Sequence, residues 1–102
     1  MPYAEPLSDA ELTEALRALD GWERDGRAIR RTIECSDFRA AVALVDAVAD
    51  AAEAANHHPD IAITRYRRVT FTLTTHAAEA VTRRDVELAA EIDRIAARIG
   101  AA

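Results

Sequence analysis

The stretch that decides the fold is ANHHPDIAITRYRRVTFTLTTH, residues 55–76. β-Branched and aromatic residues dominate residues 60–66 and 68–76, which predicts two neighbouring strands. In the second strand, alternate positions form one face that consists of Val69, Phe71, Leu73 and Thr75. Pro59 cannot continue a helix and favours an extended conformation at His58. The proline therefore separates these strands from the segment before them.

That preceding segment is the clearest helix in the sequence. Ser36 or Asp37 can cap it, and Asn56 is the expected C-terminal residue. The apolar positions recur every three or four residues, as one face of a helix requires. They are Phe38, Ala41, Val42, Val45, Val48, Ala49 and Ala52.

Two further strands are expected in residues 22–35, WERDGRAIRRTIEC, around the tight-turn dipeptide Asp25-Gly26. Ile29, Ile33 and Cys35 share one face of the second of these strands. Arg31 falls on the same face and interrupts the apolar pattern.

Capping-box patterns predict helices near both ends of the chain: Ser8 with Glu11, and Thr82 with Asp85. Gly21 ends the first helix. The apolar positions are Leu12, Ala15, Leu16 and Leu19 in the first helix, and Leu88, Ile92, Ile95 and Ile99 in the last. The sequence thus predicts an α+β fold of order α-β-β-α-β-β-α. Its four-stranded antiparallel sheet carries three helices on one face.

Length and composition are those of a single domain, residues 1–102. The formal net charge of −5 disfavours direct binding to nucleic acid. No run of about 18 apolar residues is available to span a membrane, and the N-terminus lacks the pattern of a signal peptide. Cys35 is the single cysteine, so it has no partner for an intramolecular disulfide. We therefore expect a cytoplasmic protein.

Histidine is the residue type that indicates chemistry in this chain. His57 and His58 are adjacent in the turn before Pro59, and His76 ends the polar side of the last strand. Imidazole can accept or donate a proton near pH 7, which suits acid–base catalysis. A purely structural role and a zinc site remain alternatives. Zinc is disfavoured because the spacing is not His-x-x-x-His and no cysteine cluster is present.

Two carboxylates lie close to the histidine pair in sequence. Glu53 precedes His57 by one helical turn, and Asp60 follows the proline. Either could orient an imidazole or hold a heterocycle, or could simply be a solvated surface group. Neither a glycine-rich phosphate loop nor a Gly-x-Ser-x-Gly motif is present, so nucleotide-dependent transfer and serine-type acyl chemistry are unsupported.

Together these residues resemble the pterin-4a-carbinolamine dehydratase family. The resemblance extends over nearly the whole chain and is carried by Leu7-Ser8, Gly21-Trp22, Asp37-Phe38, Glu53, Asn56-His57-His58-Pro59, Tyr66, Val69, Leu73, Thr75-His76, Thr82, Asp85 and Leu88-Ala89. It implies dehydration of 4a-hydroxytetrahydropterin to quinonoid dihydropterin and water. That reaction recycles the pterin cofactor of aromatic amino-acid hydroxylation, and it needs neither a metal nor a further cofactor.

The resemblance also implies roles for individual residues. His57 and His76 become the expected acid–base pair, and His58 a substrate-positioning residue, although the two adjacent histidines could exchange roles. The expected pterin contacts are Asn56, Pro59, Thr74, Thr75 and Ala77, while Glu53 and Asp85 belong to the same pocket and orient the imidazoles.

Three positions depart from the family pattern. Ile61 replaces a tryptophan, Ala80 replaces a glycine, and Arg67 stands where many members have asparagine. The loss of an indole from the pocket wall would weaken or broaden pterin binding. An alternative is therefore a non-catalytic interaction module, either a dimerisation cofactor of a transcription factor or an assembly factor. Family members form dimers or tetramers, so we expect a homodimer or homotetramer in either case.

Overall fold

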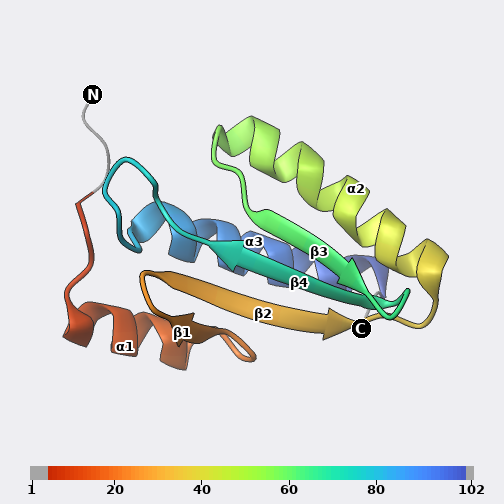
Figure 1. The fold of residues 1–102 in the computed structure, drawn as a ribbon, viewed down its shortest axis with the longest axis horizontal. Helices are drawn as coiled ribbons and strands as arrows, with labels where there is room; N and C mark the ends of the chain where they lie inside the picture. The colour runs from red at the N-terminus through yellow and green to blue at the C-terminus, as the bar shows by residue number, and fades with distance from the viewer. Residues whose placement is uncertain (1–4, 101–102) are drawn as a thin grey trace.

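In the computed structural model, which describes residues 5–100, three helices and four strands follow in the predicted order (Figure 1). The helices are α1 (Asp9–Arg17), α2 (Phe38–Ala55) and α3 (Arg83–Ile99). The strands are β1 (Glu23–Asp25), β2 (Ala28–Glu34), β3 (Asp60–Thr64) and β4 (Arg68–Leu73). They form one antiparallel sheet of order β1-β2-β4-β3. The predicted α+β fold is confirmed.

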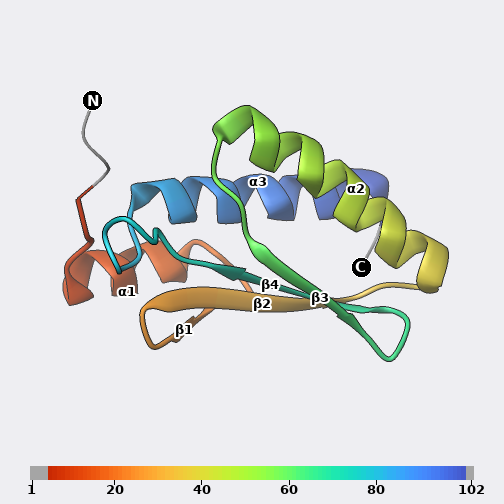
Figure 2. The same cartoon turned by 45° about the horizontal axis from the view of Figure 1, so that its top comes forward.

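The helices cover one face of the sheet, as predicted, and α2 and α3 lie side by side (Figure 2). The strands turn alternate residues inward to meet them, which is why β4 alternates between buried and half-buried positions. The large apolar side chains that the sheet and the two long helices bury fully are Ile29, Ile33, Leu44, Val48, Val69, Phe71, Leu73, Ile92 and Ile95.

The structure explains why Arg31 interrupts an apolar strand face. Its Nη1 donates to Asp93 Oδ1 of α3 at 2.7 Å, and the Trp22 indole Nε1 donates to the same oxygen at 2.8 Å. The Arg31 and Asp93 side chains are only 24% and 25% exposed. The Asp93 carboxylate thus accepts hydrogen bonds from both the guanidinium and the indole at the edge of the core. Burying either donor there without a hydrogen-bond partner would cost free energy of folding.

Predicted element boundaries were wrong in several places. The first helix, α1, ends at Arg17 and does not reach Gly21. The turn between β1 and β2 is Gly26-Arg27, because Asp25 still pairs with Ala28. Arg65 and Tyr66 leave β3 and form the β3–β4 turn with positive φ angles. The last strand ends at Leu73, so residues 74–76 lie in the loop that follows it.

The predicted apolar stripe of α2 was partly wrong. Phe38 and Val42 are 53% and 45% exposed, whereas Leu44 is fully buried. The inward face consists of Ala41, Leu44, Val48 and Ala52. Because α2 is rich in alanine, apolar residues occupy most of its circumference, and packing against α3 and β4 selects which of them point inward.

Candidate active site

Antiparallel pairing brings the two histidine-bearing segments to the same end of the sheet. Asp60 at the start of β3 pairs with Thr72 near the end of β4. The residues just before β3 and those just after β4 must therefore be neighbours. This places the His57-His58 turn beside the loop that carries His76.

The turn before β3 is fixed by the end of α2. Asn56 ends the helix in the left-handed conformation, with φ 50°. The backbone N–H of His57 donates to the Ala52 carbonyl at 3.1 Å, which closes the helix end. Pro59 then prevents further helix, so the chain leaves α2 sharply with His57 directed inward and His58 outward. Their exposure agrees, since His57 is buried and His58 is exposed.

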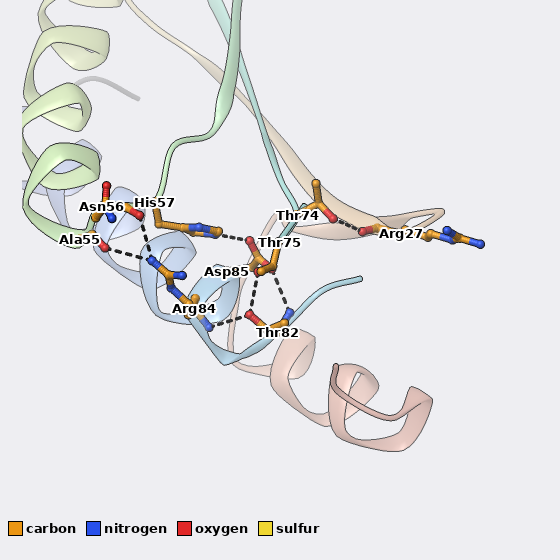
Figure 3. Close-up of polar contacts among 9 residues, drawn as sticks. All are labelled: Arg27, Ala55, Asn56, His57, Thr74, Thr75, Thr82, Arg84 and Asp85. Atoms are coloured by element: carbon orange, nitrogen blue, oxygen red, sulfur yellow. Dashed lines mark hydrogen bonds and ion pairs between the residues drawn. The ribbon is translucent and has the colours of Figure 1, made fainter. Parts of the chain in front are cut away.

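The imidazole of His57 contacts a buried carboxylate. His57 Nε2 lies 2.5 Å from Asp85 Oδ1, and Asp85 is fully buried in the first turn of α3 (Figure 3). The other oxygen of Asp85 accepts from the Thr75 hydroxyl at 2.8 Å and from the Thr82 backbone N–H at 2.9 Å. The Asp85 carboxylate therefore has two roles: it completes the predicted capping box with Thr82, and it binds the His57 ring.

Counting donors and acceptors fixes the direction of this network. Thr75 has one hydroxyl proton, which goes to Asp85, so its 2.8 Å contact with Thr82 Oγ1 must be donated by Thr82. Every donor around Asp85 then points at its oxygens, which suits a carboxylate at the N-terminus of a helix. A carboxylate accepts only, so His57 Nε2 carries a proton and neutral His57 has its lone pair on Nδ1.

The second histidine has a different environment. His58 Nε2 lies 2.5 Å from Glu53 Oε2, but these side chains are 55% and 76% exposed. Such a pair in water contributes little to stability, about 0–1 kcal/mol. Its effect is to direct the His58 ring back along α2.

A cavity of about 200 Å³ lies between the two histidine-bearing segments. Its lining consists of Asn56, His57, His58, Thr74, Thr75, His76, Ala77 and Arg84. The Thr74 hydroxyl donates to the Arg27 carbonyl at 2.5 Å, which ties this wall to the β1–β2 turn (Figure 3). The volume is below the ~300–1,000 Å³ typical of small-molecule sites, so the cavity has room for part of a small ligand.

Comparison with known proteins identifies the family. Residues 5–95 match the family model described as pterin 4 alpha carbinolamine dehydratase. The chain belongs to the pterin-4-alpha-carbinolamine dehydratase family. A Nocardia farcinica relative provisionally named as such a dehydratase is 54% identical over 92 residues, which cover 90% of this chain and 96% of the relative. A Roseiflexus relative with the same provisional name is 53% identical over 89 residues, covering 87% and 95%.

Two solved structures have the same fold. The Brucella melitensis protein described as a transcriptional coactivator/pterin dehydratase superposes with a TM-score of 0.84 at 41% identity, over 90% of this chain and 99% of that one. A pterin dehydratase-like protein identified as a RuBisCO assembly factor of the alpha-carboxysome superposes with a TM-score of 0.65 at 22% identity, over 74% and 89%. The second likeness shows a shared fold.

Seven of the ten residues predicted for the dehydratase site line the cavity, and three do not. Glu53 lies outside the cavity but contacts His58, which lines it. Pro59 shapes the turn, and Asp85 lies behind His57. The structure adds Arg84, which the sequence did not indicate as a site residue. No sequence pattern would have revealed it, because its partners are the Ala55 and Asn56 carbonyls, 29 and 28 residues away.

None of the three residues that depart from the dehydratase family pattern lines the cavity. Ile61 is on the edge strand β3 and is 36% exposed. Ala80 pairs with Thr75 and closes the loop that carries His76. Arg67 lies at the other end of the β3–β4 hairpin and donates to the Cys35 carbonyl.

Residues 5–100 lack two further features. None of the helices in this part of the chain is long and apolar enough to cross a membrane. In the same residues, histidine, cysteine, aspartate and glutamate side chains form no group of three or more that could hold a metal ion.

Proposed function

We propose that this protein dehydrates 4a-hydroxytetrahydropterin to quinonoid dihydropterin and water, and so returns a pterin cofactor to use after aromatic amino-acid hydroxylation in the cytoplasm. Family membership supports the reaction class. The observation that carries the proposal is the cavity in which His57, backed by buried Asp85, shares a wall with His58 and His76.

The reaction requires two proton transfers. The C4a–O bond breaks as the hydroxyl gains a proton and departs as water, and a ring nitrogen loses a proton to form the quinonoid double bond. We assign removal of the ring proton to His57, because Asp85 keeps its Nδ1 free to accept. We assign protonation of the hydroxyl to His76, which is exposed and can exchange its proton with solvent.

The remaining cavity residues would position the pterin. Asn56 and Thr74 offer polar groups beside the ring, Thr75 lines the buried side, and Ala77 leaves room for the flat ring. Pro59 holds the turn in place, and the Glu53–His58 pair adds a hydrogen-bonding group at the open side. The small volume of the cavity supports a substrate whose ring enters while its side chain stays in solvent.

The test is stopped-flow decay of enzymatically generated 4a-hydroxytetrahydropterin with the wild type, His57→Ala and His76→Ala. We expect acceleration by the wild type and loss of most of it, about 10²-fold or more, in both variants. His58→Ala serves as the comparison and should raise KM more than it lowers kcat. A folded wild type that does not accelerate the decay would exclude this function.

The second candidate is a non-catalytic interaction module, and exposed apolar surface favours it. Phe38 and Val42 lie exposed on α2, and β3 is an edge strand whose Ile61 is also exposed. We propose that these surfaces form a homodimer or homotetramer or bind another protein. The name of the Brucella relative, which joins coactivator and dehydratase, is consistent with both roles. Two results together would support the interaction module. The wild type would show no dehydratase activity, and Phe38→Asp would lower the molar mass measured by light scattering.

A further inference from the structure

Arg84 joins the two helices that meet at the cavity. Its Nη2 donates to the Asn56 carbonyl at 2.9 Å and to the Ala55 carbonyl at 3.3 Å (Figure 3). Its side chain also lines the cavity. The last carbonyls of a helix lack intrahelical partners, and a guanidinium supplies strong, charge-assisted hydrogen bonds to them. Arg84 therefore holds the end of α2.

The position of Arg84 is unfavourable for its own helix. It lies in the first turn of α3, where the helix dipole favours acidic residues and disfavours cations. The opposite holds at the C-terminus of α2, where its guanidinium lies. A residue that opposes its own helix but matches a neighbouring helix end indicates a role in joining the two.

Arg84 and its neighbour Asp85 bind two adjacent residues of the turn, Asn56 and His57. The Asn56 carbonyl that Arg84 binds belongs to the peptide group that joins Asn56 to His57. Asp85 binds Nε2 of the His57 ring. Two adjacent residues on one turn of α3 thus fix both the backbone and the ring of His57.

We propose that Arg84 is a positioning residue for His57: it holds the Asn56–His57 peptide where the imidazole can reach both Asp85 and the cavity. This inference deepens the proposed dehydratase function and rests on it. Without Arg84, the left-handed Asn56 and the turn after it would be free to shift, and the imidazole would move with them. A displacement of about 1 Å of a reacting group can cost about 10²-fold in rate.

The experiment compares Arg84→Ala with Arg83→Ala, since Arg83 is the adjacent, exposed arginine. Two readouts are used: stopped-flow kinetics, and the imidazole ¹⁵N NMR signals of His57. For Arg84→Ala we expect kcat to fall about 10- to 100-fold with KM changed less than about threefold, and the His57 Nε2–H signal to broaden or shift. Arg83→Ala should match the wild type in both readouts.

Chemical rescue separates positioning from general loss of structure. Guanidinium ion is added at concentrations far below those that unfold the wild type. It should restore part of the kcat of Arg84→Ala, but it should not restore the kcat of His57→Ala. Arg84→Lys keeps the charge but not the planar fork, so it should fall between the wild type and Arg84→Ala, and it replaces the alanine variant if that does not fold. Wild-type kcat and an unchanged His57 spectrum in Arg84→Ala would overturn the proposal. A wild type without dehydratase activity would refute the proposed function instead, and the His57 spectrum would still test Arg84.

Discussion

Replacing Asp85 with asparagine tests the proton arrangement at the site. Asp85 Oδ2 accepts from the Thr82 backbone N–H, a donor that cannot reorient. The single oxygen of an asparagine must therefore stay there, and its NH₂ group must face His57 Nε2. Two N–H groups cannot bond to each other, so His57 must move its proton from Nε2 to Nδ1. The nitrogen that should accept the substrate proton then becomes a donor.

The size of the effect follows from burial. Asp85 is fully buried, and the His57 side chain is 9% exposed. To retain the productive tautomer, Asp85→Asn would have to leave a buried N–H unsatisfied, at a cost of about 1–3 kcal/mol. This corresponds to a fall in kcat of about 5- to 150-fold, since about 1.4 kcal/mol is a factor of ten.

The assay combines stopped-flow kinetics with ¹⁵N NMR of the imidazole, which reports which ring nitrogen carries the proton. Asp93→Asn is the matched control, because Asp93 is a half-buried carboxylate on the same helix that contacts Arg31 and Trp22 instead of a histidine. It should lower stability and leave kcat unchanged. If Asp85→Asn keeps wild-type kcat while its NMR spectrum shows the proton on Nδ1, the assignment of His57 as the base is refuted.

Three other changes test the fold and its surfaces. Phe71→Ala removes a fully buried ring from the central strand and should lower the free energy of unfolding by about 3–5 kcal/mol in urea titrations; a loss below about 1 kcal/mol would contradict its place in the core. The backbone hydrogen bond from Ser8 lowers the pKa of Glu11 below its usual 4.5, so the capping box stabilises the fold above that pH and loses its effect as the pH falls through the lowered pKa. The stability difference between wild type and Glu11→Gln should accordingly shrink in acid, and a constant difference would refute it. Ile61→Lys places a charge on the exposed edge strand and should reduce self-association in light scattering, whereas an unchanged molar mass would exclude this edge as the contact.

Local signals predicted helix starts well. Both capping boxes, Ser8 with Glu11 and Thr82 with Asp85, are present as the sequence indicated. Asn56 also ends α2, in the left-handed conformation that asparagine tolerates better than most residues. In each case the hydrogen bonds that form the feature join residues close in the chain, so their pattern is visible in sequence.

Signals that depend on distant partners were less informative. Arg31 looked like an interruption in a strand, because its partner Asp93 lies 62 residues away. The exposed Phe38 could not be distinguished from the buried Leu44 in a helix where both are apolar. Arg84 bonds to backbone carbonyls, which carry no side-chain identity in a sequence. Long-range geometry decided all three.

The shared carboxylate of Asp85 has a consequence for the evolution of the fold. The same group completes the cap of α3 and contacts His57, so, under the proposed function, a lineage that gives up catalysis still has a reason to keep it. Descendants that became scaffolds would be expected to lose the histidines first and to retain the aspartate. Its presence in a relative therefore says little about whether that relative is an enzyme, whereas the His57 and His76 positions are the ones to inspect.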